Sequence, residues 1–162
     1  MTKKPLSSSM EVVSLLQICR DIETVCAEIY HVYAERFAAD EDLRELWQKT
    51  FEEERNHANQ FVMAINLRRD GVVVNMNIDR ARATQILEMV KGIYSGILVN
   101  MPSKIDALRS AIKLEKKLSE FHLDVMADFQ DEGMKKMFSA MMMADNQHVQ
   151  RIETMYQKYL RT

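Results

Sequence analysis

Glycine and proline are scarce in this 162-residue chain, which contains four and two of them respectively. Together they make 6 of 162 residues, under a third of the roughly 12% that is average for proteins. An all-β sandwich or barrel needs many more turn residues than this. The scarcity therefore predicts an all-α protein built from long helices, and the length allows about one domain.

Cysteine is also scarce, because only Cys19 and Cys26 occur and they are seven positions apart. Two cysteines cannot build a disulfide framework or a zinc site made of paired C-x-x-C motifs. We therefore expect a reduced, cytoplasmic setting, with both thiols buried as small core residues rather than acting in redox chemistry. A signal peptide is not expected either, since polar residues interrupt the apolar stretch that follows Lys3 and Lys4.

Long hydrophobic runs and basic blocks are both missing. The one segment that suggests a membrane, Gly92–Val99, has a G-x-x-x-G pattern but only eight residues, where a membrane-spanning helix needs about twenty. We expect this segment to form a buried, locally loosened helix or turn. The net charge is −2 and no run of five basic residues occurs. Neither a membrane nor a nucleic acid is therefore an expected partner.

What the chain does contain is a helical pattern with 47% hydrophobic and 28% charged residues. Residues 1–9 are polar and expected to be flexible, so the folded domain should span residues 10–162. Helix-capping and helix-ending signals predict four long helices over about residues 10–37, 40–69, 103–129 and from 131 or 133 almost to the C-terminus. A shorter helix capped by Asp79 should run to about Val90 within the crossover, and Ser103-x-x-Asp106 resembles a capping box. The expected fold is a four-helix bundle whose long crossover contains a short extra helix.

Each predicted long helix carries an acidic residue in the middle of an apolar stripe. At 100° per residue, Glu23, Glu54, Glu115 and Asp145 each lie on a face made otherwise mostly of hydrophobic side chains. An unpaired ion buried in a protein core costs several kcal/mol. The stripes therefore predict a compensating positive charge inside the bundle, and a pair of metal ions is the obvious one.

The spacing of these acids repeats between the two halves of the chain. Glu23 and Glu54 are 31 residues apart, and Glu115 and Asp145 are 30 apart. The second acid of each pair begins an acid-x-x-His motif, with His57 in one half and His148 in the other. The expected metal ligands are therefore Glu23, Glu54, His57, Glu115, Asp145 and His148. Such oxygen and nitrogen ligands suit two iron ions, with manganese or zinc as substitutes.

A third motif, Glu28-x-x-His31, lies about 140° from Glu23 on the charged side of its helix. It is expected to be a solvated pair rather than part of the metal site. Seven residues after the first acid of each half come two polar side chains, Tyr30 and His122. Because helical side chains lean toward the N-terminus, Tyr30 should reach the ligands by a hydrogen bond, whereas the shorter His122 should need a water.

These residues resemble the ferritin-like di-iron carboxylate superfamily, most closely its rubrerythrin-like branch. The resemblance spans about residues 10–160 and is carried by Glu23 with Tyr30, by the two acid-x-x-His motifs and by Glu115. Three departures accompany it: Asp145 stands where the family usually has glutamate, Leu118 stands where rubrerythrins have a further carboxylate, and the rubredoxin domain is missing.

The resemblance implies an enzyme that reduces hydrogen peroxide or dioxygen with electrons from a separate donor protein such as a rubredoxin. Tyr30 and His122 are then the expected catalytic residues beside the metals, and a homodimer is the expected assembly. Two alternatives stay open: a ferritin-type protein that oxidises and stores Fe(II) in a cage, and a helical protein with a vestigial metal site. The cage ranks below the enzyme because 61 positions separate Glu54 from Glu115, more than in cage-forming relatives.

Asp145 also predicts an asymmetric centre. Its side chain is shorter than that of glutamate by one methylene, so a bridge between the two metals should be lost. We expect the metal near Glu115 and His148 to be the weaker one.

Overall fold

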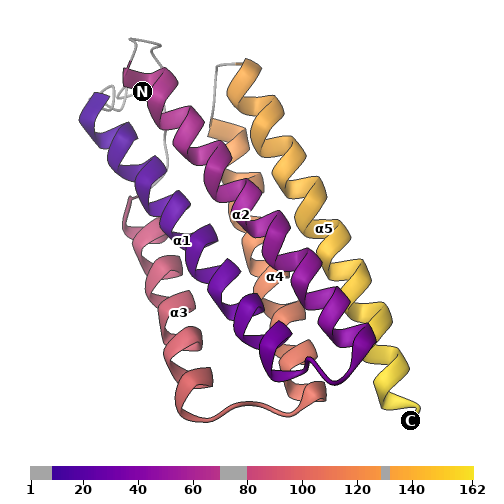
Figure 1. Ribbon diagram of the computed structural model, residues 1–162. Helices are drawn as coiled ribbons and strands as arrows, with labels where there is room; N and C mark the ends of the chain where they lie inside the picture. The colour runs from indigo at the N-terminus through magenta and orange to yellow at the C-terminus, as the bar shows by residue number, and fades with distance from the viewer. Residues whose placement is uncertain (1–8, 70–79, 129–131) are drawn as a thin grey trace.

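The computed structural model describes residues 9–69, 80–128 and 132–162, and these residues form five helices (Figure 1). In chain order the helices are α1 (Ser9–Arg36), α2 (Glu41–Arg69), α3 (Arg80–Val99), α4 (Lys104–Asp128) and α5 (Glu132–Leu160). They pack together as one bundle, which confirms the all-α expectation. The four long helices begin and end close to the predicted positions. The expected flexible N-terminus, the Asp79 cap and the helix end near Phe129 fall outside the described residues.

Two antiparallel helix pairs make up most of the bundle. Helix α1 packs along α2 and α4 packs along α5, while α2 and α5 approach each other over a shorter stretch. Figure 1 shows α3 running back along the length of the bundle, beside α1, so that α2 and α4 point in the same direction. The crossover thus lets the second helix pair lie against the first with its acids at the same height.

Capping contacts define the starts of α2 and α4. Asp40 accepts a hydrogen bond from the amide of Leu43 at 3.3 Å, as expected of an N-cap. Ser103 accepts one from the amide of Asp106 at 3.1 Å, and its hydroxyl contacts the Asp106 carboxylate at 2.9 Å. Ser103 therefore caps α4 as predicted, with the Asp106 carboxylate bonded to its hydroxyl.

The same Asp40 ties the two helix pairs together at one end of the bundle. Lys104 lies 2.6 Å from its carboxylate, and the Tyr159 hydroxyl donates to the same oxygen. An ion pair between Lys158 and Asp42 adds a second link between α5 and α2. These contacts fix the register of α5 against α2, and this register determines which side chains meet in the core.

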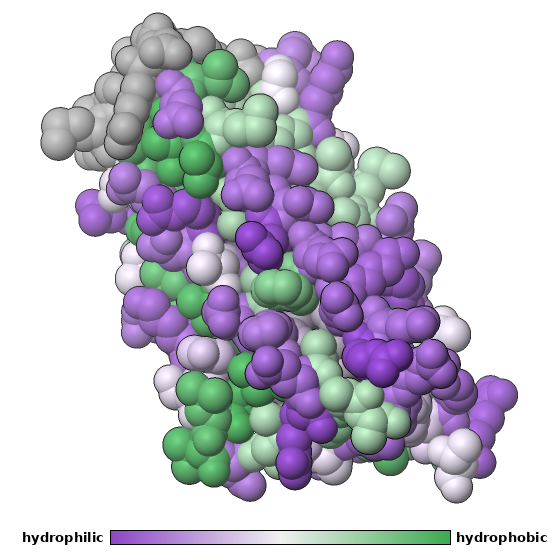
Figure 2. Space-filling model, in the orientation of Figure 1, coloured by the Kyte–Doolittle hydropathy of each residue, from purple (hydrophilic) through white to green (hydrophobic). Residues whose placement is uncertain are grey.

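The extra helix differs from the expectation in length and in burial. It is 20 residues long, whereas the sequence predicted an end near Val90. The segment Gly92–Val99 is regular helix, yet most of it is exposed, and Val99 is 89% exposed. Figure 2 shows hydrophobic residues at the surface where α3 ends. The expectation of a buried, loosened segment was wrong because α3 lies outside the four long helices and buries only one face, formed by Ala83, Ile86, Leu87, Val90 and Ile97.

Among the described residues, none of the helices is both long and apolar enough to cross a membrane. The exposed G-x-x-x-G pattern is therefore a feature of a surface helix.

Alanine in place of Gly92 or Gly96 should stabilise the protein. Nothing lies within 4 Å of a Cβ built at either position, and glycine inside an exposed helix costs about 0.5–1 kcal/mol relative to alanine. Each substitution should raise the free energy of unfolding by about that amount, measured by urea denaturation. A decrease in stability that depends on protein concentration would instead mean that this face packs against a second copy of the chain.

Candidate metal centre

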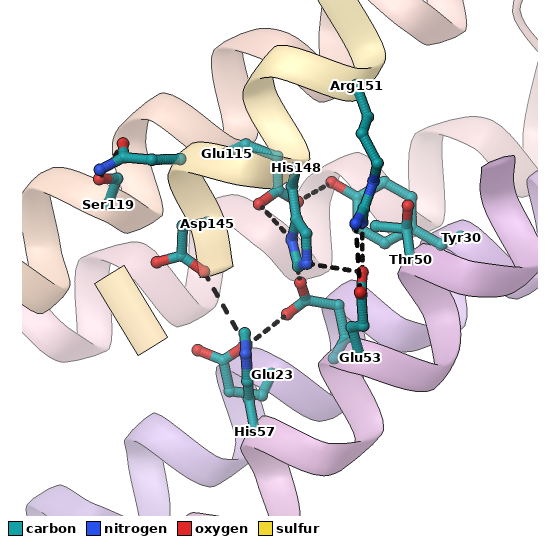
Figure 3. Close-up of polar contacts among 12 residues, drawn as sticks. Glu23, Tyr30, Thr50, Glu53, His57, Glu115, Ser119, Asp145, His148 and Arg151 are labelled. Carbon is teal, nitrogen blue, oxygen red and sulfur yellow. Dashed lines mark hydrogen bonds and ion pairs between the residues drawn. The ribbon is translucent and has the colours of Figure 1, made fainter. Parts of the chain in front are cut away.

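The four acids predicted from the apolar stripes meet inside the bundle. Glu23, Glu54, Glu115 and Asp145 come from α1, α2, α4 and α5, and each is 0% exposed. Figure 3 shows the labelled acids with His57 and His148 around one interior space. The periodicity argument thus placed all six expected ligand residues correctly in the core.

The donor atoms of these six residues form two groups that share one side chain. One group contains Glu54, Glu115, Asp145 and His148, and the other contains Glu23, Glu54 and His57. Within each group, one ligand atom from every residue lies within 4.8 Å of the others. Two buried carboxylate and histidine groups can therefore hold metal ions side by side, with Glu54 between them.

Both histidines turn the Nδ1 atom toward the carboxylates. His148 Nδ1 lies 3.0 Å from Glu54 Oε1 and 3.1 Å from Glu115 Oε2. His57 Nδ1 is more loosely placed, at 3.5 Å from Glu23, 3.6 Å from Glu54 and 3.9 Å from Asp145. The two imidazole rings are stacked with centroids 5.8 Å apart. The same nitrogen of each ring is thus available to a metal ion.

Tyr30 contacts an acid of the opposite half, and His122 lies between one acid of each half. The Tyr30 hydroxyl on α1 donates a hydrogen bond to Glu115 on α4. His122 on α4 places Nε2 at 2.9 Å from Glu23 on α1 and Nδ1 at 2.5 Å from Asp145 on α5. The expectation that His122 needs a water was wrong, because it sits directly between two carboxylates. These reciprocal contacts hold the terminal acids of both halves.

Several donor atoms in this core make no hydrogen bond of normal geometry. They are both carboxylate oxygens of Glu54 and of Glu23, Asp145 Oδ1, His57 Nδ1, His122 Nε2 and His148 Nε2. Buried polar atoms without partners are rare because each carries a desolvation cost. Carboxylate oxygens and imidazole nitrogens are ligands that suit iron, manganese and zinc. The donor set therefore fits two transition metal ions.

Without metal, the histidines compensate part of the buried negative charge. Burial alone would lower the pKa of each imidazole, but contacts with carboxylates outweigh it and raise the pKa to about 11 for His57, about 10 for His122 and about 12 for His148. Burial also opposes ionisation of Glu23, yet the charge of His122 lowers its pKa to about 2. Three imidazolium groups thus face four buried acids.

Glu115 is the acid that this compensation leaves least stable as an anion. Burial, followed by the charge of Glu54, raises its pKa to about 7 despite the contact with His148. A metal ion at this position would replace the missing positive charge.

Sequence reasoning missed Glu53 and Arg151, which extend the site toward the surface. Glu53 Oε2 lies 2.9 Å from His148 Nε2, and Arg151 pairs with both oxygens of Glu53. Burial opposes ionisation of Glu53, but contacts with His148 and Arg151 lower its pKa to about 2. Glu53 lies off the apolar stripe, so the periodicity did not single it out. The three-residue step from His148 to Arg151 was the only signal in the sequence.

Asp145 makes the two donor groups unequal, because it belongs to one of them whereas Glu54 belongs to both. It joins the group of Glu54, Glu115 and His148, and its second oxygen is occupied by His122. The group with fewer donors is therefore Glu23, Glu54 and His57. The expected loss of a bridge at Asp145 agrees with these groups, whereas the expected weaker metal binding near Glu115 and His148 stays a prediction.

Glu28 and His31, which were expected to be solvated, lie outside the site, whereas Cys26 is buried close to its acids. Glu28 is exposed, and His31 pairs with Glu35 at 3.5 Å on the outer face of α1. Cys26 is fully buried, and burial, followed by the charge of Glu54, raises the pKa of its thiol well above the usual value. Such a thiol is a poor nucleophile, which agrees with a packing role.

No family model, curated protein or solved structure matches this chain. The assignment of the site therefore depends on its geometry and chemistry.

The stability of the metal-free protein should decrease as the pH rises. The pKa of Glu115 is raised from 4.5 to about 7 in the folded state. Between these pH values the folded state keeps a proton that the unfolded state releases, so the free energy of unfolding falls as the pH rises. The raised histidine pKa values remove more stability above about pH 6.5, where the unfolded state releases its protons first. The melting temperature of chelated protein should therefore be highest near pH 5 and fall toward pH 9.

Metal-loaded protein should show a smaller decrease over the same range, because metal binding competes with protons and strengthens as they leave. Scanning calorimetry with and without a chelator measures both curves. Identical curves at neutral pH would contradict a metal centre at these residues.

Proposed function

We propose that this protein is a di-iron oxidoreductase of the rubrerythrin type, with a ferritin-like bundle, that reduces hydrogen peroxide or dioxygen. The observation that carries the proposal is Glu54, which belongs to two adjacent donor groups buried in the core. A shared carboxylate suits two metal ions close together better than one isolated structural ion. Iron is the first candidate, and manganese or zinc can occupy the same ligands.

Iron bound in this centre would supply the electrons by cycling between its ferrous and ferric states. Reduction of one hydrogen peroxide to two waters consumes two electrons and two protons. The chain supplies groups that hold protons next to the centre, at the Tyr30 hydroxyl and on the imidazole of His122. Phe61 and Phe138, both 0% exposed, pack beside His122 and keep bulk water from that side.

We propose that the electrons come from a separate donor protein such as a rubredoxin. We propose a cytoplasmic homodimer as the working form. Storage of iron in a cage is the rival function, and it differs in two measurable ways. A cage sediments as a much larger particle, and it oxidises many more than two ferrous ions per chain.

An anaerobic titration tests the proposed reaction. In protein loaded with two ferrous ions per chain, one equivalent of hydrogen peroxide should oxidise both ions. The growth of the ferric absorption band measures this oxidation. Zinc-loaded protein is the control and should not react. Failure of peroxide and dioxygen to oxidise the loaded protein would contradict the proposal, and continued turnover of added Fe(II) would favour iron storage.

Replacement of Tyr30 by phenylalanine should slow this oxidation without preventing metal binding. The hydroxyl that donates to Glu115 is lost, and removal of such an outer partner costs about 10- to 100-fold in activity. Stopped-flow absorbance measures the rate. Tyr33→Phe is the matched control, because Tyr33 is also buried on α1 and contacts Trp47, but its hydroxyl meets Ser110 rather than an acid of the site. Equal oxidation rates for Tyr30→Phe and Tyr33→Phe would show that the Tyr30 hydroxyl has no specific role in the reaction.

A further inference from the structure

His148 is held on both sides of its ring. Its Nδ1 faces Glu54 and Glu115 at 3.0 and 3.1 Å, whereas its Nε2 lies 2.9 Å from Glu53 (Figure 3). Arg151 contacts both oxygens of Glu53, with Nη1 at 3.1 Å from Oε1 and Nη2 on Oε2. We call Glu53 and Arg151 the outer pair. It connects α2 and α5 directly beside the metal centre.

The chemistry of imidazole gives the outer pair a role. A neutral imidazole has one N–H and one lone pair, and the partner of one nitrogen determines the state of the other. A carboxylate at Nε2 keeps an N–H there, so the proton that a metal ion displaces is the one on Nδ1, which faces the centre. Arg151 holds that carboxylate with the two-pronged geometry that suits a planar guanidinium.

The location of the outer pair makes these contacts effective. The side chain of Glu53 is 30% exposed and that of Arg151 is 26% exposed, so both are partly shielded from solvent. Shielded, two-pronged pairs hold their geometry better than flexible ion pairs at the surface. Arg151 also follows His148 by three residues, so both project from the same side of α5. One helix therefore places the imidazole and the charge that secures its partner.

The other half of the centre lacks the outer pair. The two acid-x-x-His motifs align Glu54 with Asp145, so Glu53 corresponds to Ala144 and Arg151 corresponds to Gln60. His57 is correspondingly looser, with its Nδ1 at 3.5 to 3.9 Å from three carboxylates. The smaller donor group, Glu23, Glu54 and His57, is also the one without this support.

We propose that Glu53 and Arg151 are positioning residues that orient His148, so that its half of the centre binds metal first and more tightly. The inference rests on the proposed metal centre and deepens it, because it assigns an order of loading to the two ions. It predicts two unequal binding steps in the unaltered protein. A metal-free protein prepared with a chelator should therefore take up one ion per chain before the second.

Calorimetric titration with Co²⁺ tests this order, and the visible spectrum of Co²⁺ reports the ligands at each step. Glu53→Leu should weaken the tighter step about 10- to 100-fold and leave the weaker step within about twofold. Glu53→Gln should lose less, because its amide keeps an oxygen beside Nε2. Arg151→Met should also weaken the tighter step. Glu52→Leu is the matched control, since Glu52 is the exposed neighbour on the same helix, and it should change neither step.

Two backgrounds identify the half that responds. With His57→Ala, Glu53→Leu should still weaken the remaining step by the same factor. With His148→Ala, Glu53→Leu should have no further effect, because the ring that it positions is gone. The melting temperature of each metal-free variant shows whether it folds. If Glu53→Leu does not fold, the same titrations are made with Glu53→Gln.

Each result has one meaning. Equal affinities for the two ions in the unaltered protein, or an unchanged tighter step in Glu53→Leu and Glu53→Gln, would overturn the positioning role while leaving the metal centre in place. An equal effect of Glu53→Leu in both histidine backgrounds would overturn it as well. Absence of any Co²⁺ binding by the unaltered protein would instead defeat the proposed function.

Discussion

Four buried carboxylates at one height of the bundle are the constraint on which the rest of the structure depends. Each long helix contributes one of them, and all four are fully excluded from solvent. Isolated charges in such an interior cost several kcal/mol each. Three histidines offset part of that cost when no metal is bound. The unsatisfied oxygens of Glu23 and Glu54 indicate that protons alone do not complete the compensation.

The arrangement of the helices follows from the need to bring these acids together. Helix α3 returns the chain along the bundle, so α4 starts at the end where α1 finishes (Figure 1). This places Tyr30 on α1 opposite Glu115 on α4, and His122 on α4 opposite Glu23 on α1. The two halves thus secure one another's acids. The exceptions to this symmetry are Asp145, His122 and the Glu53–Arg151 pair, and all three distinguish the two metal positions.

The sequence was sufficient to predict the helices and the six inward-facing acids and histidines, because both depend on periodicity within single helices. Glu23 and Glu54 stand out since a charge on an apolar stripe has to be compensated. Contacts across helices were not predictable in the same way. The meeting of Glu53 with His148 depends on the register of α5 against α2, which the Asp40 contacts set at the end of the bundle. The exposed end of α3 was missed because an apolar run does not reveal how many neighbours it has.

Anomalous diffraction tests most directly whether Glu54 lies between two metal ions. Crystals of the protein loaded with Mn²⁺ or Fe²⁺ should show two anomalous peaks per chain. The peaks should lie about 3.5–4 Å apart, one beside Glu23 and His57 and the other beside Glu115 and His148. A single peak held by one group, or no peak with all six side chains ordered, would contradict a shared two-metal centre.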